Sequence, residues 1–423
     1  MSRTPTTPPP EAGDPARGRW WALAVIALAQ VGAMSTWFSA SAVAPSLARE
    51  WQLTPSHLAL LTVAVQLGFV TGGLAIAVSG VADLVSPRWV FATAALVAAI
   101  ANAALILVPG HLALALALRF ALGASLAGVY PIGMKMMTEW FRQNRGLAIG
   151  TVVGALTLGT ALPHALVRFG VACGLTWQPV ILATSACAVA AAVLIAGFVR
   201  PGPFAVRADR VDLGWALRSL RLPAYRLANF GYFGHMWELY AMWTWLPAFL
   251  LASMRAFPVG LPEPAARGWA SGVAAVAIGA GALGCVAGGL IADRWGRTLL
   301  ASSAMTISAA SAVAAAILFG RAPLVVAAIC TVWGISVIAD SAQFSASISE
   351  LADPDRVGSA LALQTALGFL LTTISIQVLP IMAARFGWPA AVTLLAAGPV
   401  LGTAAMLKLR RRPEAVRLAG GRL

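Results

Sequence analysis

The segment 231–247, GYFGHMWELYAMWTWLP, places ionisable side chains inside a long apolar run. His235 and Glu238 are three residues apart, so in a helix they lie on the same face. Glu238 falls roughly 14 residues into the apolar run, which is about 21 Å along a helix and close to the middle of a membrane. A low dielectric favours the neutral form of a carboxyl, so such a group can carry a proton across. We therefore predict a proton-coupling role for Glu238 and His235; the alternative is that Glu238 only hydrogen-bonds a neighbouring helix.

Arg119 and Asp340 also interrupt apolar segments. Ionisable residues inside a membrane are costly and are functional candidates by default. The planar fork of arginine suits a carboxylate, which predicts a substrate-binding role for Arg119. The alternative is a structural arginine that bonds carbonyl groups of adjacent helices. Gln343 lies one helical turn after Asp340, and this polar pair suits either a small polar solute or hydrogen bonds between helices.

The composition indicates a polytopic membrane protein. Of the 423 residues, 60% are hydrophobic and 10% are charged, whereas soluble domains have about 25% charged residues. A helix needs about 20 apolar residues to cross the hydrocarbon layer, and we predict twelve spans. They cover roughly 20–44, 56–80, 89–109, 112–137, 146–168, 177–199, 224–253, 268–292, 298–319, 322–348, 357–384 and 388–408.

Several classes of function are not indicated. The four cysteines have no C-x-x-C spacing, so neither a zinc site nor a disulfide framework is expected. No phosphate-binding loop or hydrolase motif is present, so we expect no enzyme activity, no metal and no cofactor. The net charge of +14 could indicate a nucleic-acid partner. However, most of the basic residues fall on one side of the predicted spans, where they can touch anionic lipid instead.

This charge asymmetry predicts that both termini are cytoplasmic, because loops rich in lysine and arginine stay inside. The only long connection between spans lies at 200–222, after the sixth span. We therefore predict a disordered cytoplasmic tail (1–19), an N-terminal six-helix bundle (20–199), a cytoplasmic central loop (200–222), a C-terminal six-helix bundle (223–409) and a basic cytoplasmic tail (410–423).

The two halves repeat each other. SGVADLVSPRW (79–89) follows the second span, and GGLIADRWGRT (288–298) follows the eighth. In both, an aspartate at a helix end is followed by arginine, which can form charge-assisted bonds that hold one conformation; the alternative is a cluster that only sets topology. We refer to this predicted group as the latch: Asp83, Arg88, Asp293, Arg294 and Arg297.

After the first 19 residues, the chain resembles the major facilitator superfamily along nearly its whole length. GLIADRWGR (289–297) matches that family's loop motif well, SGVADLVSPR (79–88) is a degenerate copy, and RFALG (119–123) matches its fourth-span motif. The resemblance implies twelve helices in two pseudo-symmetric bundles, with spans one, four, seven and ten around a central cavity. It thereby brings Tyr130, Glu238 and Asp340 toward one volume, with Ser35, Thr36 and Trp37 from span one.

We therefore expect a secondary active transporter of the bacterial inner membrane that works by alternating access. The predicted cargo is a small organic or inorganic anion, moved by proton symport, and the predicted substrate-binding residues are Arg119, Tyr130, Trp37, Tyr240, Asp340 and Gln343. Proton-driven efflux of hydrophobic compounds is the alternative, and a membrane sensor that transports nothing is the alternative from another class. The expected partners are the solute, protons and membrane lipids, with no nucleic acid, and we expect a monomer.

Overall fold

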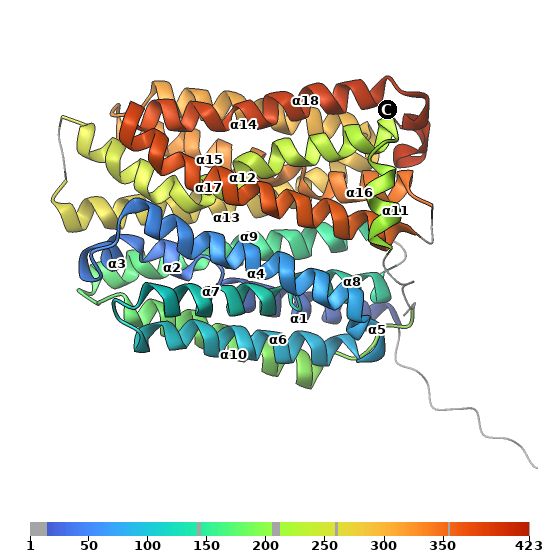
Figure 1. Ribbon diagram of the computed structural model, residues 1–423, viewed down its shortest axis with the longest axis horizontal. Coiled ribbons are helices and arrows are strands. Elements are labelled where there is room, and N and C mark those ends of the chain that lie inside the picture. Colours follow the sequence, from blue (N-terminus) through green and yellow to red (C-terminus); the bar gives the residue numbers. More distant parts are fainter. Residues whose placement is uncertain (1–14, 142–144, 205–211, 259–260, 354–355, 423) are drawn as a thin grey trace, which may run out of the picture.

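The computed structural model describes residues 15–141, 145–204, 212–258, 261–353 and 356–422, and all its elements in these ranges are helices. The predicted all-α membrane fold is confirmed. Figure 1 shows two layers of roughly parallel helices, the first half of the chain in blue to green and the second half in yellow-green to red. We name these layers the first lobe and the second lobe.

The first lobe holds α1 (Pro15–Met34), α2 (Ser39–Ala42), α3 (Ala44–Glu50), α4 (Pro55–Ser79), α5 (Val81–Leu84), α6 (Pro87–Ala103), η1 (Ala104–Leu107), α7 (Leu112–Leu126), α8 (Tyr130–Trp140), α9 (Arg145–Ala172) and α10 (Gln178–Phe198). The second lobe holds α11 (Leu213–Ser219), α12 (Pro223–Ala256), α13 (Glu263–Trp295), α14 (Arg297–Ile317), α15 (Pro323–Ala339), α16 (Ser341–Leu351), α17 (Val357–Leu395), α18 (Ala397–Arg410) and η3 (Pro413–Gly421).

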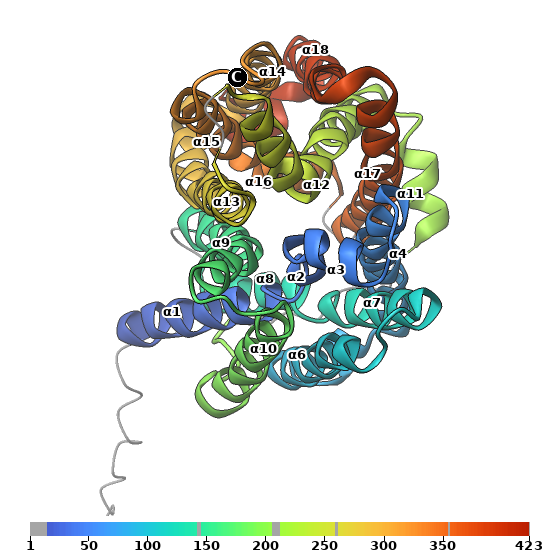
Figure 2. The same cartoon turned by 90° about the vertical axis from the view of Figure 1, so that its left-hand side faces the viewer.

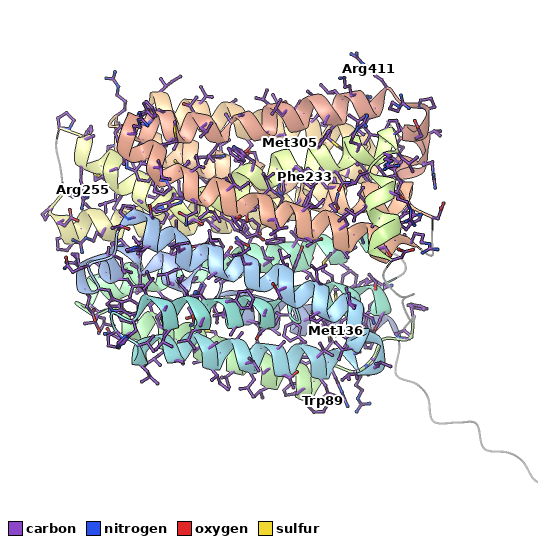
Figure 3. The ribbon with its side chains drawn as sticks, viewed as in Figure 1. Trp89, Met136, Phe233, Arg255, Met305 and Arg411 are labelled. Carbon is purple, nitrogen blue, oxygen red and sulfur yellow. The ribbon has the colours of Figure 1, made fainter. Side chains whose placement is uncertain are left out.

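The helices are consistent with the twelve predicted spans. Nine stretches of the described chain are long and apolar enough to cross a membrane, and the stretch Val357–Arg410 joins two spans at Gly387, whose φ is 83°. Gly18–Met34 is a shorter apolar helix. The 34-residue α12 is also long enough, but it carries the polar and aromatic residues of segment 231–247. Arg255 and Arg411 lie toward opposite ends of the long axis (Figure 3).

The predicted segment boundaries stay predictions. Residues 1–14 and 205–211, in the predicted tail and central loop, lie outside the described residues. Within the same predicted segments, α1 begins at Pro15 and α11 occupies part of 200–222.

Three spans are broken near their middle. The first breaks between α1 and α2, the fourth between α7 and α8, and the tenth at Asp340, between α15 and α16. The fourth and tenth spans hold equivalent places in the two halves, so the repeat extends to the position of the break. A break frees backbone carbonyl groups from the helix ladder, and inside a membrane these need other partners. The breaks therefore place irregular backbone beside Trp37, Tyr130 and Asp340.

Close helix packing holds each lobe together. An added Cβ on Gly123 of α7 would lie 2.1 Å from the carbonyl oxygen of Val65 in α4, and one on Gly68 would lie equally close to that of Phe120. The RFALG glycine therefore lets α4 and α7 touch along their backbones.

We expect Gly123→Ala to lower the free energy of unfolding by about 1–3 kcal/mol, because α4 and α7 must separate to admit the methyl group. The measurement is the unfolding midpoint in mixed detergent micelles. Gly73→Ala on α4 is the matched control, since its added Cβ would meet nothing closer than 4.0 Å. Equal midpoints for the two variants would contradict the packing argument.

The lobes meet along two helix pairs, α9 with α13 and α4 with α17 (Figure 2). Small residues line the first pair: a Cβ on Gly150 would lie 3.1 Å from the carbonyl oxygen of Cys285, and one on Gly289 would lie 3.2 Å from that of Gly146. The smooth surfaces of such helices suit the rocking of one bundle against the other.

Candidate functional site

Aromatic rings from both lobes meet between them. Phe69 and Phe369 have ring centroids 4.6 Å apart, and Trp37 and Tyr240 have centroids 5.7 Å apart. These distances are those of favourable aromatic pairs. We name the buried set the aromatic cluster: Trp37, Phe38 and Phe69 from the first lobe, and Tyr240, Trp243 and Phe369 from the second. Because the rings pack on one another across the boundary, the lobes cannot separate without exposing ring faces.

Two indole donors in the aromatic cluster lack partners. The Nε1 atoms of Trp37 and Trp243 are buried, and neither bonds any acceptor among the described residues. Both rings pack on Tyr240, with centroid distances of 5.7 and 5.5 Å. A buried donor without an acceptor costs about 1–3 kcal/mol. The cluster therefore combines flat apolar faces with N–H groups that an oxygen-bearing solute could satisfy.

His235 pairs with Asp340 rather than with Glu238. The Nδ1 atom of His235 in α12 lies 2.9 Å from Oδ1 of Asp340, at the break between α15 and α16, and both side chains are 1% exposed. The ring of His235 packs against Phe344 and Tyr232, with centroid distances of 5.3 and 6.2 Å. Its Nε2 atom has no partner within the described ranges. The pair thus joins the seventh and tenth spans through two buried polar side chains.

Glu238 points to a different part of the second lobe. Its Oε2 atom accepts a hydrogen bond of 2.7 Å from the hydroxyl of Ser308 in α14, and its Oε1 atom accepts one of 2.7 Å from Nε1 of Trp333 in α15. The side chain is 1% exposed. Glu238 and His235 therefore lie on the same helix face but contact different partners. Both donors are neutral, and no cation pairs with Glu238 among the described residues.

Arg119 is enclosed by oxygen atoms of its own lobe. Its Nη1 atom donates to the carbonyl oxygen of Thr36 at 3.2 Å, the hydroxyl of Ser39 at 3.2 Å and Oδ1 of Asn102 at 3.1 Å. Its Nη2 atom donates to the carbonyl oxygen of Trp37. Two of these acceptors are carbonyl groups freed by the break between α1 and α2. With 1% of the residue exposed, the contacts favour the structural interpretation of Arg119 over anion binding.

Tyr130 begins α8, at the break in the fourth span, and is only partly buried. It stands at the break in the fourth span, as Asp340 stands at the break in the tenth.

Known proteins resemble this chain in sequence and in fold. The sequence profile of the Major Facilitator Superfamily matches residues 26–376. The chain belongs to this family. Members of the Major Facilitator Superfamily are transporters rather than enzymes, so this chain is a multi-pass membrane transporter of a small-molecule substrate, surrounded by lipid.

One curated relative is the niacin transporter NiaP of Acinetobacter baylyi (strain ATCC 33305 / BD413 / ADP1). It is 29% identical over 178 residues, which cover 40% of this chain and 37% of the relative. The chain therefore matches well under half of that protein's length.

Two solved transporters share the fold of this superfamily member. A bacterial homologue of the human lysosomal transporter Spinster, solved in an inward-facing and unoccupied conformation, has a TM-score of 0.67 at 15% identity, with 94% of this chain and 99% of that chain covered. A point mutant of the nucleoside transporter NupG has a TM-score of 0.70 at 12% identity, with 93% and 99% covered.

In this superfamily member, the second copy of the loop motif connects α14 to α16. Arg297 donates to both carboxylate oxygens of Glu350, at 2.8 and 2.6 Å, and to Oε1 of Gln343 at 3.0 Å. Glu350 also accepts a 2.9 Å bond from the backbone N–H of Ala419. The side chain of Gln343 therefore bonds to the latch residue Arg297, although Gln343 lies one helical turn from Asp340.

The other predicted latch residues make different contacts. The side chains of Asp83 and Asp293 lie outside the described part of the chain. The guanidinium of Arg88 lies 5.1 Å from the ring centroid of Trp89, and Arg294 is exposed. Arg297 is thus the latch residue whose contacts join two helices.

Three buried glutamines complete the list of candidates, and the sequence interpretation missed them. The side-chain amides of Gln30, Gln66 and Gln364 are at most 1% exposed and have no hydrogen-bond partner within the described ranges. Gln364 lies one helical turn before Gly368, so the two residues share a helix face. A Cβ added to Gly368 would lie 2.2 Å from the ring of Tyr232, so this face is turned toward α12. An amide inside an apolar span was the available signal.

Proposed function

We propose that this protein is a proton-coupled transporter of a small aromatic carboxylate, a solute of the class of nicotinate. The observation that carries the proposal is the aromatic cluster with its two unpartnered indole donors. When the lobes rock apart, the rings offer flat faces to a planar solute, and the N–H groups offer hydrogen bonds to a carboxylate. The partial match to a niacin transporter supports the same solute class.

In this proposal the solute's carboxylate meets the indole donors rather than Arg119. All of the bonds that Arg119 donates end on its own lobe. Turning the guanidinium toward a solute would leave the carbonyl oxygen of Trp37 without a donor. The carbonyl of Thr36 and Oδ1 of Asn102 would then share the single hydroxyl proton of Ser39. The anionic solute class predicted from the sequence is kept, while its recognition moves to Trp37 and Trp243, with Tyr130 and Tyr240 lining the path.

We assign proton coupling to the second lobe, where His235 and Asp340 form one unit and Glu238 is a second buried carboxyl. The Oδ1 atom of Asp340 lies 2.9 Å from Nδ1 of His235, and Glu238 pairs with no cation among the described residues. In this proposal the three side chains take up and release the transported proton. Uptake of an anion together with a proton avoids carrying net charge through the membrane.

The proposal places the protein in a bacterial inner membrane as a monomer, with both termini in the cytoplasm. The excess of lysine and arginine on the predicted inner loops supports this orientation. Arg297, held by Glu350 and Gln343, then lies at the cytoplasmic surface, where the latch fixes one of the two alternating states.

The experiment uses proteoliposomes with an acidic exterior and compares nicotinate with nicotinamide, which has the same ring without the carboxylate. We expect nicotinate uptake that depends on the pH gradient and is abolished by a protonophore. Vesicles without protein correct for passive permeation of the neutral acid. Equal uptake of nicotinamide, or nicotinate uptake that ignores the gradient, would contradict the proposal. Gradient-driven expulsion of neutral apolar dyes instead would favour the alternative, efflux of hydrophobic compounds.

We expect Trp243→Phe to raise KM for nicotinate about tenfold, because it keeps the ring and removes one hydrogen bond to a charged group. The measurement is the concentration dependence of initial uptake. Trp245→Phe, two residues along α12, is the control, since its indole N–H already donates to the carbonyl oxygen of Ile376 at 3.0 Å. A rise in KM of the same size in both variants would show that the Trp243 donor is not specific to the solute.

A further inference from the structure

An apolar groove lies on the side of the second lobe, away from the aromatic cluster. It has a volume of about 720 Å³ and runs between α12, α17 and α18. Its walls are the apolar side chains Leu227, Phe230, Phe233, Trp237, Leu371 and Leu401. Phe233 is labelled in Figure 3. Phe230 is 49% exposed and Leu401 is 70% exposed, so the groove opens toward the lipid.

Glycine and alanine residues form the floor of the groove. A Cβ on Gly234 of α12 would lie 2.4 Å from the carbonyl oxygen of Gly398 in α18, so the two helices approach along their backbones. Ala397, Ala404 and Ala405 continue the floor along α18. Without large side chains on the floor, a slot remains between the flanking aromatic rings, and a slot of this kind can take an acyl chain.

One end of the groove carries two positive charges. Arg226, in the first turn of α12, and Lys408, in the last turn of α18, both line it, and both are exposed. Neither forms an ion pair or a side-chain hydrogen bond with another described residue, and no acidic residue lines the groove. In the predicted orientation this end lies at the cytoplasmic surface, at headgroup depth.

We propose that the groove binds one anionic phospholipid, with its phosphate between Arg226 and Lys408 and an acyl chain along Phe230, Phe233 and Leu401. Two unpaired cations above an apolar slot complement the headgroup and the tail of such a lipid. A zwitterionic lipid carries no net charge to match them. The lipid bridges α12 and α18, so it stabilises the packing of the helix that carries His235 and Glu238. This inference does not depend on which solute is transported.

The experiment measures lipid retention and thermal stability of the purified full-length protein. We expect phosphatidylglycerol to be retained through purification, and to raise Tm when added, while phosphatidylcholine, inorganic phosphate and glycerol phosphate have little effect. Because each cation contributes about a fivefold factor, Arg226→Gln/Lys408→Gln should bind phosphatidylglycerol about thirtyfold more weakly. Native mass spectrometry of the bound lipid gives the ratio.

Two further variants separate the groove from general surface charge. Arg200→Gln/Arg218→Gln removes two exposed charges outside the groove and should leave retention unchanged. Ala404→Trp keeps both charges, fills the slot and should expel the lipid. Equal loss in the control pair, equal retention of phosphatidylcholine, or equal stabilisation by soluble phosphate would each overturn the proposal. So would unchanged retention in Ala404→Trp.

Discussion

Asp340→Asn is expected to abolish proton-driven accumulation of nicotinate while leaving exchange of labelled for unlabelled nicotinate intact. With one proton per solute, a pH difference of about two units supports accumulation of about 100-fold, because each unit corresponds to a factor of ten. The variant should equilibrate the solute without concentrating it. The variant is therefore expected to lose the whole nicotinate accumulation ratio of about 100-fold.

The reason lies in the contact between Asp340 and His235. Asparagine is close in size to aspartate, so it can fill the same place 2.9 Å from the imidazole without carrying a proton. Binding and rocking need only that shape, whereas coupling needs the charge to change between the two states. Exchange of labelled for unlabelled solute requires no gradient, so it reports binding and rocking without proton coupling. We expect Glu238→Gln to behave in the same way, since glutamine keeps the shape of the side chain but cannot carry the proton.

Glu414→Gln is the matched control, because it removes a carboxyl that is 38% exposed and lies outside the membrane-spanning helices. It should accumulate nicotinate as the wild type does. Accumulation at the wild-type ratio in Asp340→Asn would refute the assignment of the pair. If Glu238→Gln alone kept full accumulation, Glu238 would be a structural residue held by Ser308 and Trp333.

The sequence was sufficient to predict the architecture. Apolar runs of membrane length predict the spans, and the repeated D-x-x-x-x-R and D-R-x-G-R loops predict two related halves. These signals are local or periodic, so they can be recognised without knowledge of the contacts between helices. The breaks in the spans were harder to predict: Pro131 signals the one before α8, whereas no proline or glycine marks the break at Asp340.

Partner choice inside the membrane was not predictable from spacing. His235 and Glu238 share a helix face, yet one contacts α15–α16 and the other contacts α14 and α15. Which neighbour each side chain reaches depends on helix rotation and on small residues that set interhelical distance, and neither is encoded in the spacing within one helix. For the same reason, the sequence could not show that Arg297 donates a hydrogen bond to Gln343.

Arg119 shows how two interpretations of one residue can be separated by structure. From sequence, an arginine in a span is equally compatible with binding an anion and with bonding carbonyl groups. The break at residues 35–38 decides between them, because it leaves the carbonyl groups of Thr36 and Trp37 without helical partners, and Arg119 donates to both. A buried carbonyl group without a donor is costly, so the arginine and the break depend on each other.

We expect Arg119→Met to lower the free energy of unfolding by about 3–5 kcal/mol. The variant leaves the carbonyl oxygen of Trp37 without a donor, and it leaves the carbonyl of Thr36 and Oδ1 of Asn102 to share the one hydroxyl proton of Ser39. Arg119→Lys should lose about 2–3 kcal/mol, since a single ammonium cannot reach every acceptor that the planar fork reaches. The measurement is the unfolding midpoint in mixed micelles, together with the nicotinate affinity of the folded fraction. Arg255→Lys is the control: Arg255 is 57% exposed in its ion pair with Glu263, so the change should stay within about 0.5 kcal/mol.

The two readouts of this experiment distinguish the structural role from the anion-binding role. If Arg119 only holds the break between α1 and α2, stability falls in both variants, and the folded fraction binds nicotinate with nearly its original affinity. If Arg119 binds the carboxylate, Arg119→Met keeps the wild-type midpoint and loses binding, because the acceptors around it do not need it. The four bonds from two nitrogen atoms to oxygen atoms of one lobe favour the first result. In that case the residue acts on transport only by shaping the segment that presents Trp37 to the solute.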